Sequence, residues 1–251
     1  MNKFLVILIV FFLVQSVIGQ KADSSIIDST SAKFVENFIE QAWNKDFETA
    51  LSIFNKAISL NDTIAEVYWR RGSLYLKNGD NEKALLDFTK SIELDSLFNN
   101  GYAYWNRAIT KEYMGDNEGA LVDYNQAVLI GEDQQNFVCF RGILKYKMGY
   151  YEGALIDLNK AIELWDDYHL ARRWRAPLRT QNADYIGAMD DYKKIHFTER
   201  DKQNPNFAYD FYLRGLAKFN TNDTIGACED WKIAEKNYKE ASEMIELNCQ
   251  Q

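Results

Sequence analysis

An alanine recurs along this chain at a nearly constant interval. Consecutive members lie 34, 36, 34, 34 and 39 residues apart, each within a similar segment such as EKALLDFTKSIEL or EGALIDLNKAIEL. A period near 34 residues is typical of proteins that stack one supersecondary unit many times. The chain is therefore expected to fold as a repeat array. The six alanines are Ala50, Ala84, Ala120, Ala154, Ala188 and Ala227.

Each period reads as two helices joined by a short turn. The turns, such as NGDN and MGDN, are rich in residues that end helices or tolerate unusual backbone angles. Only two prolines occur in 251 residues, which suits a helical chain. With the alanine at position twenty, repeats are expected to start near Ser31, Ala65, Gly101, Gln135, His169 and Ala208.

Small and bulky side chains alternate at fixed positions of the repeat. Position eight is Gly or Ala in repeats two to six, and position twenty-four is bulky throughout. This alternation lets facing helices interdigitate closely. The bulky residues are Phe54, Phe88, Tyr124, Leu158, Tyr192 and Trp231.

This pattern over about residues 31–236 resembles the tetratricopeptide repeat (TPR) family. The resemblance implies an all-α fold, a right-handed TPR superhelix (α-solenoid) of six helix-turn-helix repeats. It also implies that the first helices line a concave groove. We expect residues 237–251 to add a capping helix and tail. Two departures stand out: the proline usual near the end of the unit is absent, and repeats one and five are degenerate.

An arginine at position seven and an aspartate at position twenty-three occur together in repeats two to six, always 16 residues apart. Repeat one lacks both, with Asn37 and Ile53 instead. Because the two charges are present together or absent together, they predict a salt bridge between the two helices of a repeat. The alternative is that the arginines form a row that binds an anionic polymer. The expected pairs are Arg71–Asp87, Arg107–Asp123, Arg141–Asp157, Arg175–Asp191 and Arg214–Asp230.

In the family geometry, the first helices would present many aromatic side chains to the groove. Aromatic residues dominate binding hot spots, so an apolar or aromatic segment of a partner protein is the expected ligand. The alternative is that some pack as core between repeats. The best-known peptide-binding members of the family hold a C-terminal carboxylate with Lys and Asn, and this chain does not have that set of residues at the corresponding positions. The same register predicts that Cys139 faces the groove. The candidate groove residues are Trp69, Tyr102, Trp105, Tyr113, Tyr146, Arg173 and Tyr212.

Repeat five carries four arginines in its first helix, HLARRWRAPLRTQ. They could recognise an anionic glycan or phosphate, with Arg173 as the candidate contact; the alternative is that neighbouring aspartates neutralise them. Pro177 predicts a kink or a late start of this helix. Residues 197–206, FTERDKQNPN, explain the interval of 39 as a loop insertion.

The N-terminus resembles a secretory signal. Lys3 precedes eleven apolar residues, FLVILIVFFLV, which are too few to span a bilayer. We expect a signal peptide over 1–19, a flexible lead-in over 20–31, and a periplasmic or secreted protein. The alternative is an N-terminal anchor, in which case only the signal segment would contact the membrane.

Three cysteines in an exported chain permit one disulfide. In an antiparallel helix pair about a turn at Asn237, Cys228 would meet Cys249, and their disulfide would hold the capping helix at the end of the array.

Charge and motifs exclude several classes of function. The net charge is 29 − 37 = −8, which argues against nucleic-acid binding. No phosphate-binding loop or nucleophile elbow occurs, and neither histidine has a second ligand at helical spacing. We therefore expect a non-catalytic scaffold without metal or cofactor, binding an unidentified protein partner. Self-assembly through the ends of the array is the alternative, and the oligomeric state stays open.

Overall fold

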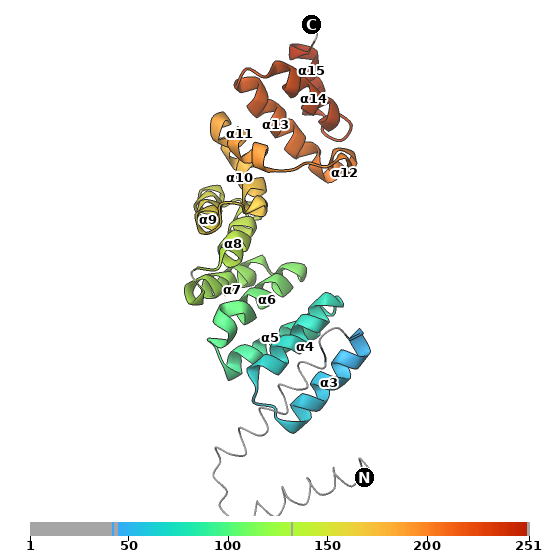
Figure 1. Cartoon of the computed structure of the whole chain (residues 1–251), viewed down its shortest axis with the longest axis vertical. Helices are drawn as coiled ribbons and strands as arrows, with labels where there is room; N and C mark the ends of the chain where they lie inside the picture. The colour runs from blue at the N-terminus through green and yellow to red at the C-terminus, as the bar shows by residue number, and fades with distance from the viewer. Residues whose placement is uncertain (1–41, 43–44, 132, 250–251) are drawn as a thin grey trace, which may run out of the picture. The chain divides into compact units, whose positions relative to one another are not determined.

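A computed structural model of the chain describes residues 42, 45–131 and 133–249 (Figure 1). The predicted signal peptide, the lead-in and most of the first helix of repeat one lie outside these residues. The described residues contain helices and turns but no strand. They belong to two compact units divided between Met114 and Gly115, and each unit is treated separately below.

The first unit contains four α-helices among its described residues. A short 3₁₀ turn, Phe98–Gly101, precedes the last of them. The first helices of repeats two and three begin at Ala65 and Tyr102, within one residue of the expected repeat starts. The helices are α3 (Phe47–Leu60), α4 (Ala65–Lys77), α5 (Asn81–Leu94) and α6 (Tyr102–Tyr113).

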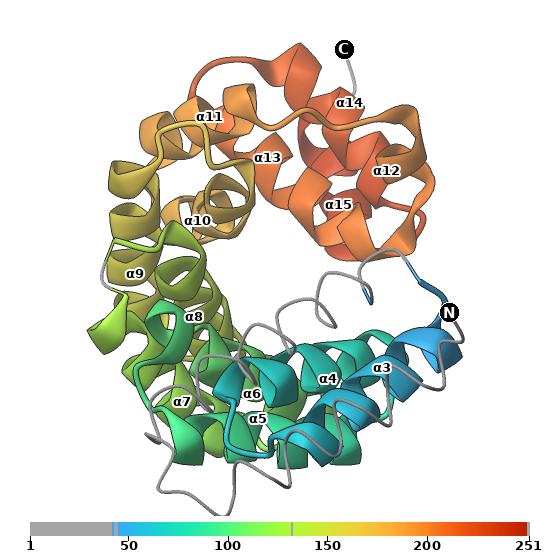
Figure 2. The ribbon, with the colours of Figure 1, turned by 60° about the horizontal axis from the view of Figure 1, so that its bottom comes forward.

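The second unit contains the rest of the array. Figure 2 shows its helices following one another as antiparallel pairs, and α8 packs closely on α9. The helices are α7 (Asn117–Ile130), α8 (Gln135–Lys147), α9 (Tyr151–Leu164), α10 (His169–Gln181), α11 (Tyr185–Lys194), α12 (Glu199–Gln203), α13 (Ala208–Asn220), α14 (Thr224–Ala234) and α15 (Glu240–Asn248).

Aspartates start most of the second helices. The carboxylate of Asp116, for example, accepts a hydrogen bond from the backbone N–H of Gly119 at 2.9 Å, which satisfies one of the unpaired amides at the helix start. The second helix of repeat four differs, because Tyr150 precedes α9 and provides no such bond. The same cap is formed by Asp46, Asp80, Asp184 and Asp223.

The turn inside repeats two to six has one residue with a positive φ at position fifteen. Glycine supplies it in repeats two to four, with φ between 82° and 83° at Gly79, Gly115 and Gly149. Repeats five and six use Ala183 at 60° and Asn222 at 67°. Because the Cβ of alanine opposes this conformation, Ala183 is the strained member of the set.

The small residues at position eight pack against the bulky residues at position twenty-four. A Cβ added to Gly72 would lie 2.9 Å from the ring of Phe88, and one added to Gly142 would crowd Leu158 at 3.2 Å. In repeat six the indole of Trp231 fills the space over Gly215 and donates a hydrogen bond to the carbonyl of Tyr212 at 3.3 Å. The two helices of a repeat therefore approach closely, as the sequence pattern predicts.

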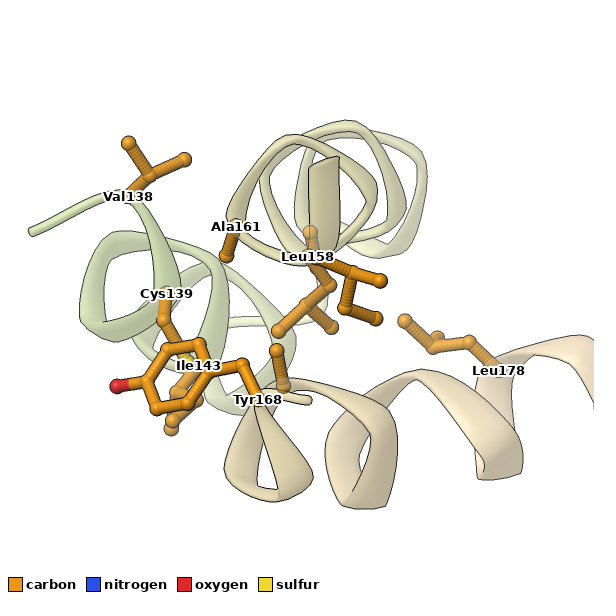
Figure 3. Close-up of a cluster of buried hydrophobic side chains, with 10 residues drawn as sticks. Val138, Cys139, Ile143, Leu158, Ala161, Tyr168 and Leu178 are labelled. Atoms are coloured by element: carbon orange, nitrogen blue, oxygen red, sulfur yellow. The ribbon is translucent and has the colours of Figure 1, made fainter. Parts of the chain in front are cut away.

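A cluster of buried side chains joins α8, α9 and α10 (Figure 3). Leu158 and Ala161 on α9 lie between the two first helices, and Leu178 reaches the cluster from α10. Tyr168, in the loop before α10, lies across Cys139 and Ile143 and donates a hydrogen bond to the side chain of Asn136 at 2.7 Å. The loop that leads into repeat five therefore covers part of the hydrophobic core of repeat four.

Repeat five is more regular than its sequence indicates. Helix α10 starts at His169 and continues through Pro177, so the predicted late start is wrong. The insertion before repeat six is also partly ordered, since it contains α12 and a 3₁₀ turn at Pro205–Phe207. Thr198 and Asp201 form a reciprocal capping box at the start of α12.

Candidate functional site

In four of the five expected arginine–aspartate pairs, both residues belong to the same compact unit. All four of these pairs are formed. Arg141 contacts Asp157 through two parallel hydrogen bonds, from Nε at 2.8 Å and from Nη2 at 2.7 Å. The aspartate side chain is almost fully buried. Arg107 and Asp123 belong to different units, so that pair stays a prediction. The other formed pairs are Arg71–Asp87, Arg175–Asp191 and Arg214–Asp230.

Three of these four arginines also donate a hydrogen bond to an amide of the preceding repeat, which the sequence analysis missed. Arg71 Nη1 donates to Asn55 at 2.7 Å, and Arg175 Nη1 donates to Asn159 at the same distance. Arg141 donates to Asn125 at 3.2 Å. The amide precedes the arginine by 16 residues, the same offset that separates the arginine from its aspartate. One guanidinium therefore links the second helices of two successive repeats.

A second cation shares the aspartate in the later repeats. Lys145 Nζ lies 2.8 Å from Asp157, and Lys218 Nζ lies 2.9 Å from Asp230. Position nineteen is then glycine, and a Cβ at Gly153 would lie 3.3 Å from Lys145 Cδ. Repeat two differs, because position eleven is Tyr75 and position nineteen is Lys83, whose Nζ lies 5.3 Å from the tyrosine ring and pairs with Asp80.

The arginines of repeat five already have carboxylate partners. Asp191 is fully buried and receives Arg172, Arg175 and Arg179 at 2.9, 2.6 and 3.1 Å. Arg173 pairs with Asp210 at 3.2 Å, and its guanidinium lies 3.7 Å above the ring of Phe207. An anion would have to displace these contacts, so the geometry gives the anion-binding alternative no support.

In the first unit, the candidate residues form an aromatic surface on α4 and α6. Trp69 packs edge-on against Phe98 with ring centroids 5.9 Å apart, and Tyr102 packs against Trp105 at 5.7 Å. These candidates are half-buried, whereas Tyr113 is 71% exposed. The indole N–H of Trp69 is buried without a hydrogen-bond partner among the described residues. This surface is the N-terminal aromatic face, Trp69, Tyr102, Trp105 and Tyr113.

The second unit carries a larger aromatic surface. Tyr146 on α8 packs against Trp174 on α10 at 5.2 Å, and burial raises the pKa of its phenol. Gln181 on α10 donates a hydrogen bond to the hydroxyl of Tyr209 on α13 at 2.8 Å. All of these rings are half-buried, so each also has exposed surface. This surface is the C-terminal aromatic face, Tyr146, Trp174, Tyr209, Tyr212 and Tyr238.

Trp174 and Tyr238 were not among the sequence candidates. Trp174 lies one position beyond Arg173 in the repeat, and Tyr238 lies in the turn before α15, outside the repeat register. Cys139 is a correction, because it is fully buried beneath Tyr168 and does not line a surface. Its burial raises the pKa of the thiol to about 12, so it is not a reactive cysteine.

Cys228 and Cys249 form a disulfide, with Cα atoms 5.8 Å apart. The bond joins the start of α14 to the residue after α15. It holds α15 against the last repeat, where Ala241 is buried beside Trp231 and Ala234. The C-terminal helix thereby covers a surface that a further repeat would otherwise cover.

Two further observations concern the described residues only. No group of three or more His, Cys, Asp or Glu side chains is arranged to hold a metal ion, although His169 and His196 lie with ring centroids 5.8 Å apart. Among residues 42, 45–131 and 133–249, no helix combines the length and apolar character needed to cross a bilayer.

The fold and the repeated contacts define an all-α solenoid of tandem helix pairs. Residues 65–97 match the tetratricopeptide repeat family by sequence, and the chain has the multi-repeat fold of tetratricopeptide repeat proteins. It matches no curated protein by sequence.

Solved structures of other repeat proteins share this fold. PilF of Pseudomonas aeruginosa matches with a TM-score of 0.68 and 14% identity, covering 89% of this chain and 99% of that one. YrrB, described as a TPR protein with an unusual peptide-binding site, matches with a TM-score of 0.59 and 22% identity. The match covers 73% of this chain and 91% of YrrB. A tetratricopeptide repeat protein from Parabacteroides merdae matches with a TM-score of 0.54 and 20% identity. The match covers 86% of this chain and 99% of that one.

Proposed function

We propose that this protein is a non-catalytic interaction scaffold of the cell envelope that binds a segment of a partner protein along its first helices. The observation that carries the proposal is the set of half-exposed rings on α8, α10 and α13, the C-terminal aromatic face. Rings fixed by neighbours bury large areas at low entropic cost, which favours binding hot spots. The peptide-binding site named for YrrB, which shares the fold, supports this role.

The envelope location is part of the proposal. The apolar segment FLVILIVFFLV after Lys3 favours export. The disulfide between Cys228 and Cys249 supports it, because such bonds persist in oxidising compartments. Fractionation of cells producing the full chain tests the location: recovery with cytosolic markers, with both thiols free, would contradict it.

Capture from envelope extract tests the binding role. We expect wild-type protein to retain a specific partner and Trp105→Ala or Tyr212→Ala to lose most of it. Tyr150→Ala is the matched control, because this aromatic side chain is 52% exposed, precedes α9 and lies outside both aromatic faces. Thermal melting shows whether each variant still folds. Equal capture by all folded variants would exclude the aromatic faces as the binding site.

Self-assembly is the second candidate, and one observation favours it. Aliphatic side chains are exposed on the second helices, at position twenty-two in repeats two to four and at position eighteen in repeats five and six. Light scattering at rising concentration tests this candidate, since a monomer at every concentration would exclude it. The residues concerned are Leu86, Val122, Ile156, Ile186 and Ile225.

A further inference from the structure

Three tyrosines meet at the end of the last repeat. Tyr209 and Tyr212 are three residues apart and so lie on one face of α13. The ring of Tyr238, from the turn before α15, lies 4.7 Å from that of Tyr212 and 5.2 Å from that of Tyr209. The Gln181 amide fixes the hydroxyl of Tyr209. The three form a compact group of rings, the tyrosine cluster.

Two carboxylates lie beside the tyrosine cluster without a cation of their own. Glu240 and Glu243 occupy the first turn of α15 and are exposed. Within the described part of the chain neither forms an ion pair, and the nearby Lys236 and Lys239 form none either. The pKa of the Tyr212 phenol is raised by burial and then by Glu240, and that of Tyr238 is raised for the same two reasons. Glu240 follows Tyr238 by two residues, and Glu243 lies in the same first turn of α15.

The electrostatics of this corner favour a positive charge. The N-terminus of α15 contributes about half a positive charge, and residues 235–246 carry four glutamates against Lys236 and Lys239, so the local balance stays negative. The faces of the rings are negative and attract cations as well.

Two arginines of the last two repeats pack against rings elsewhere in this unit. Arg214 lies 4.6 Å from the ring centroid of Phe197, and Arg173 lies over Phe207. Both arginines also pair with an aspartate, Asp230 and Asp210. The tyrosine cluster has the rings and the carboxylates of this arrangement, and no cation of the described chain occupies it.

We propose that the tyrosine cluster and Glu240 and Glu243 bind a lysine or arginine side chain of the partner segment. This inference rests on the proposed function, because it assigns one residue type to the segment bound along the C-terminal aromatic face. The segment would place its cation at the tyrosine cluster and its apolar side chains toward Tyr146 and Trp174.

The test compares two short peptides on the isotope-labelled full chain with its disulfide intact. The probes are acetyl-Trp-Leu-Lys-amide and the same peptide with norleucine, an uncharged analogue, in place of lysine. Binding is followed by NMR shifts at the tyrosine cluster. We expect the lysine peptide to bind about fivefold more tightly at low salt, and this preference to shrink at 0.5 M salt as screening increases.

Charge variants locate the preference. Glu240→Gln/Glu243→Gln is expected to remove the preference for lysine while leaving the affinity for the norleucine peptide unchanged. Glu235→Gln/Glu246→Gln is the matched control, because it removes two exposed carboxylates from the same end of the chain. The preference should persist in that control.

The outcomes separate this inference from the function on which it rests. Equal binding of both peptides, with shifts at Tyr146 and Trp174, would overturn the cation site and leave the binding face intact. A preference that survives in Glu240→Gln/Glu243→Gln would also overturn the cation site. If neither peptide binds and the wild-type protein captures no partner, both proposals fail.

Discussion

At the scale of single residues, position fifteen of the repeat sets a backbone requirement that one repeat meets poorly. Ala183 adopts φ 60°, where its neighbours in other repeats are Gly or Asn. Gly149 has the same role in repeat four, and a Cβ there would meet no atom within 4 Å. A change at either position therefore alters backbone strain and little else.

Ala183→Gly should raise the free energy of unfolding by about 0.5–1 kcal/mol, because glycine adopts this conformation without the clash. Gly149→Ala should lower it by about 1 kcal/mol. Urea denaturation followed by circular dichroism measures both. Opposite signs in the two variants are the expected result, and a loss of stability in Ala183→Gly would refute the argument.

The side chains of single residues also set how the array responds to acid. Hydrogen bonds from the backbone N–H and the hydroxyl of Thr49 lower the pKa of Asp46 below its ordinary value of 3.8. A lowered pKa means that the cap stabilises the protein fully above pH 3.8 and is lost as the pH falls through the folded value.

Asp46→Asn should flatten the dependence of stability on pH below about 4, because asparagine caps a helix without titrating. Melting temperatures at pH 2 to 7 measure this effect. A parallel displacement of the whole profile, with no change in slope below pH 4, would contradict it.

At the scale of elements, the cations that share each aspartate decide how much one arginine contributes. Removing Arg141 leaves Lys145 2.8 Å from Asp157. Removing Arg71 leaves Asp87 without a second cation from α4, because Tyr75 stands where repeat four has Lys145. An unpaired buried charge is costly, so the two changes should differ.

We expect Arg71→Ala to destabilise the protein by about 3 kcal/mol and Arg141→Ala by about half of that. Asp157→Ala should cost more than Arg141→Ala, because it leaves two cations without their carboxylate. The double variant Arg141→Ala/Asp157→Ala should cost less than the sum of the single variants, as expected for residues in contact. Additive losses in urea denaturation would exclude a direct contact.

The capping helix depends on its covalent bond. Helix α15 has nine residues, too few to be stable alone in water. The Cys228–Cys249 bond closes about 22 residues, so Cys249→Ser should lower stability by about 3 kcal/mol. Hydrogen exchange of the α15 amides should rise in the variant and in reduced wild-type protein alike. Unchanged protection in both would show that packing alone holds α15.

The elements follow from the sequence because the same local pattern recurs in register. Three features depend on contacts within one repeat: the helix starts, the close packing over position eight and the arginine–aspartate offset. The periodicity of the sequence is enough to predict contacts of this kind. Contacts between repeats were harder to find. The amide partners Asn55, Asn125 and Asn159 carried a readable signal, since they precede each arginine by 16 residues.

At the scale of the whole molecule, the candidate binding surface was only partly predictable. Tyr146 and Tyr212 follow from the register of the first helices. Cys139 does not, because Tyr168 comes from a loop and covers it. Tyr238 also comes from a turn, and the disulfide rather than helical periodicity fixes the helix that follows it. Residues in loops and turns cannot be placed from helical periodicity, so their contacts were not predicted.

The arginine that reaches back to the preceding repeat gives the array a direction. Repeats one, three and four each present an amide acceptor, Asn55, Asn125 or Asn159, to the arginine of the repeat that follows. A chain leaving the ribosome N-terminus first has that acceptor in position before the matching arginine is synthesised. Synthesis from the N-terminus therefore gives the arginines of repeats two, four and five an acceptor that is already present, whereas the reverse order would leave these three arginines without their amide until the preceding repeat was made.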